Sequence, residues 1–202
     1  MLTIRKFLLS PTTFKVVSRL LFVCFLLLLN FVIVFKTGKE LIIYDSFEGL
    51  SVLPFERRLK IGLTSFLFVE GGIFEFIDDF IPNVLVFVPF GIFLPILTKK
   101  TAFLKFLVIS FLVSLAYEIY QLITLLGFFD VDDLFANTLG FVVGYVFYLL
   151  VLKNMKNTTR TALFTLAFFI SLPFCIYAIV KTVNFFDFYY AYLQKVPSLY
   201  FK

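Results

Sequence analysis

Residues 102–152 read AFLKFLVISFLVSLAYEIYQLITLLGFFDVDDLFANTLGFVVGYVFYLLVL. The stretch consists of two apolar runs, residues 102–126 and 134–152, which are separated by a short acidic turn. About 20 apolar residues in a helix cross the hydrocarbon core of a bilayer. The stretch therefore predicts two successive transmembrane helices, and the first of them carries Glu118 inside its apolar run.

The composition of the whole chain agrees with this class of protein. The sequence has 202 residues, of which 61% are hydrophobic and 15% charged, and its mean hydropathy is +1.03. The apolar share of soluble globular domains is nearer half. We therefore expect an all-α integral membrane protein.

Two further features narrow the chemistry. The sequence contains no His, so imidazole is excluded from catalysis and metal binding, and acid–base chemistry would fall to Asp, Glu, Lys or Tyr. Cys24 and Cys175 both lie within long apolar runs, which favours small buried side chains over a disulfide framework. The net charge of +5 arises from short basic groups between apolar runs. That pattern is typical of topology control, and we expect no nucleic-acid partner.

Hydropathy predicts a single membrane domain over residues 1–202 with five transmembrane helices. The mixed stretch between the first two helices ends in residues 59–77, an apolar segment broken by Glu70 and Glu75. This segment is expected to be interfacial or re-entrant, or a short helix over the mouth of the bundle. A kink without a break is expected at Pro89 of the second helix. The five predicted spans are residues 16–35, 81–97, 102–126, 134–152 and 161–183.

The distribution of charge predicts the orientation. The N-terminus, the turn after the second span and the turn after the fourth span together hold most of the basic residues and no acidic residue. All acids except Glu118 fall on the opposite side. The positive-inside rule therefore places the N-terminus inside and the C-terminus outside.

Polar residues gather toward the outer end of three predicted spans. Glu118 and Gln121 are three residues apart and share one helical face. Asp133 and Asn137 are four residues apart and share one face of the next span. Asn83 stands at the start of the second span on the same side. Gly140 and Gly144 continue the Asp133 stripe as a small-xxx-small surface for close helix approach. The candidate ligand-binding residues are Asn83, Glu118, Gln121, Asp130, Asp133 and Asn137.

These residues have a structural explanation as well as a functional one. Amides and carboxylates in a membrane protein often serve only as hydrogen bonds between helices. A carboxylate at the depth of Glu118 is costlier than an amide, which makes Glu118 the candidate catalytic acid/base or ligand for a cation. Asp130, Asp132 and Asp133 are either caps of the following helix or candidate ligands for a divalent cation or for the amine of a ligand. The sequence contains no nucleophile dyad and no phosphate-binding glycine loop.

Three ordered strings resemble the VanZ-like family of small bacterial membrane proteins. They are Asn83-Val-Leu-Val-Phe-Val-Pro-Phe-Gly91, Glu118-Ile-Tyr-Gln121 and Asp130-Val-Asp-Asp-Leu-Phe-Ala-Asn-Thr-Leu-Gly140, and Leu53-Pro54-Phe55 is similar to an element that often precedes them. The resemblance covers about residues 50–152. Pro82 stands where relatives often have Gly, and Gly127-Phe128-Phe129 where some relatives carry an Arg.

The resemblance implies a role in the envelope of a bacterial cell, in the cytoplasmic membrane, and an association with low-level resistance to the glycopeptide teicoplanin. It leads us to expect an outward-facing polar pocket that binds an envelope lipid, a lipid-linked precursor or the lipid-tailed glycopeptide. One alternative is a membrane enzyme that acts on a lipid-linked substrate with Glu118 as acid/base. Another is an accessory subunit that docks a partner through Gly140 and Gly144. Proton-coupled transport is disfavoured because five helices show no internal repeat, unless the chain forms a homo-oligomer.

Overall fold

The computed structural model describes residues 11–34, 50–51, 72–124 and 129–200. Its contacts divide the chain into two compact units. Unit 1 consists of Met1–Val32 and Thr161–Lys202, and unit 2 of Ile33–Arg160.

The prediction of five membrane-spanning helices is confirmed within the described residues. The five helices long and apolar enough to cross a bilayer are Thr12–Val32, Phe80–Thr98, Phe103–Thr124, Val131–Leu152 and Asn157–Asp187. Residues 52–71, which include Leu53-Pro54-Phe55 and most of the expected interfacial segment, lie outside the described residues. The last part of that segment, residues 72–77, forms the start of a helix that continues into the second span.

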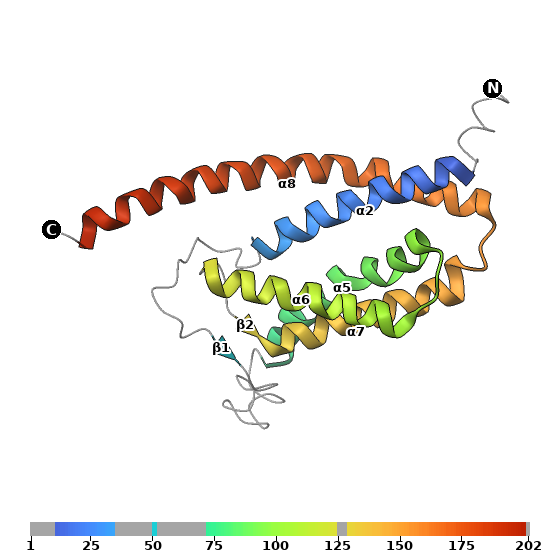
Figure 1. Cartoon of the computed structure of the whole chain (residues 1–202), viewed down its shortest axis with the longest axis horizontal. Helices are drawn as coiled ribbons and strands as arrows, with labels where there is room; N and C mark the ends of the chain where they lie inside the picture. Colours follow the sequence, from blue (N-terminus) through green and yellow to red (C-terminus); the bar gives the residue numbers. More distant parts are fainter. Residues whose placement is uncertain (1–10, 35–49, 52–71, 125–128, 201–202) are drawn as a thin grey trace. The chain divides into compact units, whose positions relative to one another are not determined.

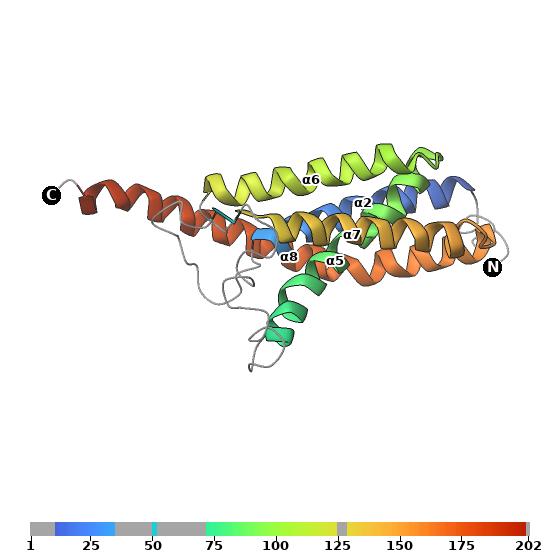
Figure 2. The same cartoon turned by 90° about the horizontal axis from the view of Figure 1, so that it is seen from below.

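Unit 1 contains helix α2 (Pro11–Val34) and most of helix α8 (Asn157–Tyr200). The ring of Phe14 lies 5.3 Å from that of Phe164 between centroids. The rings of Phe31 and Tyr177 lie 5.9 Å apart. Because both residue numbers rise together along the contact, the two helices run parallel, as Figures 1 and 2 also show.

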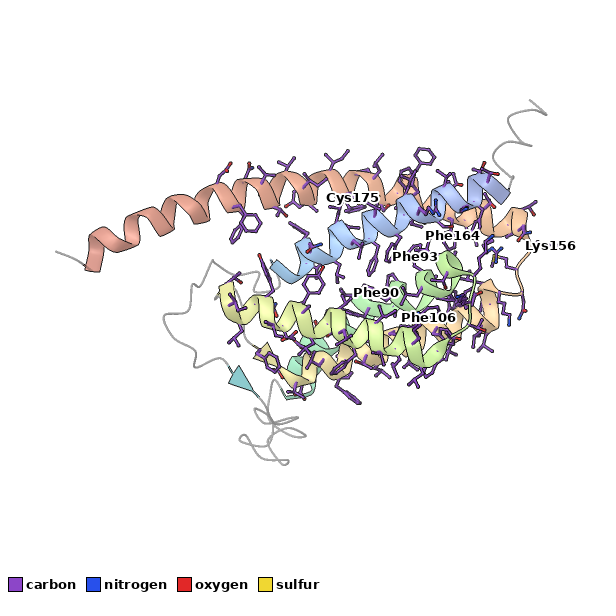
Figure 3. The ribbon with its side chains drawn as sticks, in the orientation of Figure 1. Phe90, Phe93, Phe106, Lys156, Phe164 and Cys175 are labelled. Carbon is purple, nitrogen blue, oxygen red and sulfur yellow. The ribbon has the colours of Figure 1, made fainter. Side chains whose placement is uncertain are left out.

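The two cysteines lie in the middle of the α2–α8 contact. The Cys175 thiol donates a hydrogen bond to the carbonyl oxygen of Cys24 at 3.5 Å, and both residues are buried with free thiols. Figure 3 marks Cys175 and Phe164 on α8. The expectation that these cysteines are small buried side chains is therefore confirmed.

Unit 2 is built around the contact between helix α5 (Gly72–Thr98) and helix α7 (Val131–Phe147), which α5 crosses obliquely (Figure 2). A methyl group built on Gly91 would lie 2.7 Å from the backbone carbonyl carbon of Gly144. One built on Gly140 would meet the Val84 carbonyl oxygen, and one on Gly144 the Val88 carbonyl oxygen. The two backbones are thus in direct contact, which only glycine at these positions allows.

This contact settles what Gly140 and Gly144 do. The expected close helix approach is present, and the helix that approaches is α5 of the same chain. The glycines are therefore covered by α5. A partner of the alternative accessory subunit would have to dock elsewhere, and that alternative stays a prediction. Helix α5 also continues unbroken through Pro82, Pro89 and Pro95, so the expected absence of a break at Pro89 is confirmed.

Helix α6 (Phe103–Thr124) runs antiparallel to α7 on another side of it (Figures 1 and 2). A short turn joins α5 to α6, and its Lys99 has a left-handed backbone with φ of 55°. The strands β1 (Leu50–Ser51) and β2 (Phe129–Asp130) pair in parallel just before α7 begins. Buried aromatic side chains fill unit 2, among them Phe90, Phe93 and Phe106 (Figure 3).

Helix α7 ends in a wider turn, the π-helix η2 (Tyr148–Leu152). In it the backbone N–H of Lys153 donates to the carbonyl oxygen of Tyr148 at 2.8 Å. Together α7 and η2 form a span of 22 residues. At 1.5 Å per residue this span is about 33 Å long, close to the roughly 30 Å of the hydrocarbon core.

Candidate functional site

A row of polar side chains runs along one face of α6. Ser110, Ser114, Glu118 and Gln121 are 0%, 0%, 3% and 5% exposed. Their spacing of four, four and three residues keeps them on one side of the helix. All the residues buried on α6 except Phe106 belong to this row. The buried face of α6 is therefore polar, and its exposed face is apolar.

Glu118 joins the C-terminal part of this row to the start of α7. Its Oε2 accepts a hydrogen bond from the backbone N–H of Asp130 at 3.0 Å. Asp130 is the N-cap of α7, and its own Oδ1 accepts from the backbone N–H of Asp132 at 2.9 Å. The carboxylates of Glu118 and Asp130 thus each accept a backbone N–H at the start of α7. A negative charge is favourable at this end of a helix.

Asn83 and Asp133 join α5 to α7 at the same end. The Asn83 side-chain amide donates to Oδ1 of Asp133, which lies in the first turn of α7. The predicted convergence of Asn83 with the acids of the fourth span is therefore present. Because Glu118 meets α7 at Asp130, one end of α7 is tied to both α5 and α6 by polar side chains.

Asn137 forms a second, deeper polar contact between α6 and α7. Its side-chain amide donates to Oγ of Ser114 at 2.8 Å, and both residues are buried. Since α7 begins at Val131, Asn137 lies almost two turns into the helix. The partner of Asn137 is thus Ser114.

Ser114 is the residue that the sequence reasoning missed. The signal was the repetition of a polar residue at positions 110, 114 and 118, every fourth residue of an otherwise apolar helix. Of the two serines, Ser110 has a hydroxyl without a hydrogen-bond partner among the described residues.

The acidic residues of the site do not gather as metal ligands. Among the described residues, no three His, Cys, Asp or Glu side chains lie close enough to bind one ion. Asp130 and Asp133 each accept a hydrogen bond from the protein. The described part of the chain therefore offers no ready ligand set for a divalent cation. The capping role expected for Asp130 is confirmed.

Known proteins similar to this chain match the region that contains these polar residues. The family described as VanZ/LLP1 matches residues 20–153. "Protein VanZ" of Enterococcus faecium is 32% identical to this chain over 152 residues, which cover 74% of this chain and 86% of that protein. No solved structure matches the chain. The matched family region includes Asn83, Glu118, Asp130, Asp133 and Asn137.

Proposed function

Because the chain belongs to the VanZ/LLP1 family, we propose that it lowers the susceptibility of a bacterial cell to glycopeptides such as teicoplanin. In this proposal the protein binds an envelope lipid, or the lipid tail and polar head of the antibiotic itself, at the polar end of unit 2. We name this end the acidic end, formed by Asn83, Glu118, Asp130 and Asp133. The protein spans the membrane several times, and we propose the cytoplasmic membrane as its location, with the acidic end facing outward.

The observation that carries the proposal is the arrangement of three helices around the first turn of α7. Glu118 is 3% exposed and lies six residues before the end of α6, which is about 9 Å along the helix axis. A carboxyl at such depth is costly to retain unless it is used or satisfied. The Asp130 N–H satisfies one of its oxygens. A ligand with a hydroxyl or amine head could bind the acids at this end while its tail lies along the apolar helices.

The charge pattern supports the outward orientation. The three segments predicted to be inside hold basic residues and no acids, whereas Asp130, Asp132 and Asp133 belong to the opposite side. The parallel course of α2 and α8 is what a chain with an odd number of spans requires of its first and last helix. A ligand from the outer leaflet would then reach the acidic end directly.

The test is a susceptibility assay in a glycopeptide-sensitive host, with teicoplanin compared with vancomycin. The wild-type chain should raise the inhibitory concentration of teicoplanin more than that of vancomycin. Glu118→Gln retains an oxygen that can accept from the Asp130 N–H but removes the charge, and it should lose most of this protection. Ile119→Ala is the matched control, because Ile119 is the next residue on α6 and is exposed.

The amount of folded protein in the membrane must be equal for each variant. At equal amounts, the same protection by wild type and Glu118→Gln would overturn the role of the acidic end. Loss of protection in Ile119→Ala as well would show that the assay reports folding only, which would also remove the support for the site. A wild-type chain that protects against neither antibiotic would overturn the proposed function as a whole.

A further inference from the structure

The end of unit 2 opposite the acidic end is strongly basic. We name it the basic end. It carries the exposed side chains of five lysines, together with Arg160. The sequence contains no Asp or Glu from Leu134 to Arg160. The lysines are Lys99, Lys100, Lys105, Lys153 and Lys156.

Three helix ends bring these cations together. Val84 lies against Gly140 and Val88 against Gly144, so α5 and α7 run parallel and finish at the same end of unit 2. Lys99 and Lys100 follow α5, and Lys153 and Lys156 follow η2. Figures 1 and 2 both show the α5–α6 turn at the end where η2 finishes, and Figure 3 marks Lys156 there.

Lys99, Lys100 and Lys153 follow the C-terminal ends of α5 and η2, where a cation is favourable. Lys105 is the exception. Lys105 lies in the first turn of α6, which has no acidic residue. A cation is unfavourable there because the N-terminal end of a helix is already positive. None of the five lysines forms an ion pair with a described residue. The helix ends therefore do not account for Lys105, and within the described part of the chain no ion pair compensates the mutual repulsion of the five lysines.

Arg160 differs from the lysines because its guanidinium group donates hydrogen bonds to the protein. Its Nη2 donates to Oδ1 of Asn157 at 2.7 Å, and its Nη1 donates to the Leu152 carbonyl oxygen at 3.4 Å. Arg160 therefore closes the turn after η2, whereas the lysines extend into the surroundings. The basic end thus combines one arginine that the turn holds with five lysines whose side chains are exposed.

We propose that the basic end binds the headgroups of anionic phospholipids, with the lysine ammonium groups on the lipid phosphates. The neighbouring side chains fit the rest of such a molecule. Leu104 is 70% exposed beside Lys105, and Leu150 is 71% exposed one turn before Lys153. A lipid phosphate can lie on the lysines while the acyl chain lies along the apolar helix next to them. Basic clusters beside a membrane are attracted to anionic leaflets by about 1 kcal/mol per Lys.

Purified full-length protein in a neutral detergent tests this inference. Phosphatidylglycerol and phosphatidylcholine with identical acyl chains are added together, and the bound lipids are counted by native mass spectrometry. The wild type should bind phosphatidylglycerol in preference. Lys100→Gln/Lys153→Gln should weaken that binding by on the order of 25-fold, which is about fivefold for each lysine.

The matched control is Lys15→Gln/Lys181→Gln, which removes the same charge at two exposed lysines of unit 1. It should keep the preference for phosphatidylglycerol. Equal binding of the two lipids by the wild type would overturn the inference, and so would an equal loss in both double variants. Inorganic phosphate is added in a third arm against chloride at the same ionic strength. If phosphate alone abolished the preference, the basic end would be a site for free phosphate and not for a lipid.

Discussion

Asn137 donates its side-chain amide to Ser114 Oγ at 2.8 Å across the contact of α6 with α7. The two residues are 6% and 0% exposed. This hydrogen bond links two helices below the acidic end, in the apolar interior of unit 2. Replacing Ser114 by Ala should leave the Asn137 amide without its partner and lower the free energy of unfolding by about 1 kcal/mol, within the 0.6–2 kcal/mol measured for such bonds in membranes.

Ser110→Ala is the control for that substitution, because Ser110 lies one turn away on the same buried face. Its hydroxyl has no partner among the described residues, so its removal should be neutral or stabilising by up to about 1 kcal/mol. Both free energies can be measured by thermal or denaturant unfolding in detergent. An equal effect of the two substitutions would contradict the assignment of Ser114 as the hydrogen-bonding serine.

Gly144→Ala should be among the most destabilising single changes in unit 2. A Cβ at Gly144 would lie 3.2 Å from Gly91 Cα and would also collide with the Val88 carbonyl oxygen. The backbones of α5 and α7 would have to separate, at a cost of about 3 kcal/mol. The melting temperature in detergent measures this loss.

The control for the glycine substitution is Val143→Ala. Val143 is the preceding residue of α7 and is exposed, so its truncation should change the melting temperature little. If Gly144→Ala melted like Val143→Ala, the two backbones could not be in direct contact.

Asp130→Ala should remove the N-cap of α7. The lost hydrogen bond to the Asp132 N–H should lower stability by about 1 kcal/mol, whereas Asp130→Asn should keep most of the stability because asparagine is an equally good cap. The pair of variants separates the cap from the charge. If Asn were as damaging as Ala, the negative charge of Asp130 would be what matters at this position.

Cys24 and Cys175 should react with a thiol reagent only when α2 and α8 separate. They are the two cysteines of the sequence, and they are 7% and 3% exposed. Labelling by a maleimide in detergent should be slow in the folded protein and complete in denaturant, with mass spectrometry as the measurement. Asn154→Cys, at an exposed turn, should label at once. Equally fast labelling of the native cysteines would show that α2 and α8 are apart.

The sequence was sufficient for the class of the fold because a span needs only length and apolarity. Thr12–Val32 and Phe103–Thr124 lie within a few residues of the predicted spans. The sequence was insufficient to identify the helix that packs on Gly140 and Gly144, because a stripe of small residues allows any helix to approach closely. Only the fold shows that Gly91 of α5 completes the contact.

The sequence predicted that polar groups gather at this site, but it did not predict which side chains form hydrogen bonds with each other. Asn83 lies beside the acids of the fourth span as expected, and the fold shows that its partner is Asp133. Ser114 was overlooked for a physical reason. A serine or threonine in a helix usually bonds to its own backbone, as Ser18 and Thr138 do here. Nothing in the spacing alone distinguishes Ser114, which bonds across to another helix.

The pairing of α2 with α8 sets an order for biogenesis. Unit 2 is one continuous stretch and can be complete once Arg160 has been synthesised. The contacts of Phe14 with Phe164 and of Phe31 with Tyr177 join residues about 150 positions apart. Chains are made from the N-terminus at about 5–20 residues per second. Helix α2 must therefore wait about 8–30 s for α8. During this time its buried Cys24 and Leu29 are exposed to lipid or to an insertion chaperone.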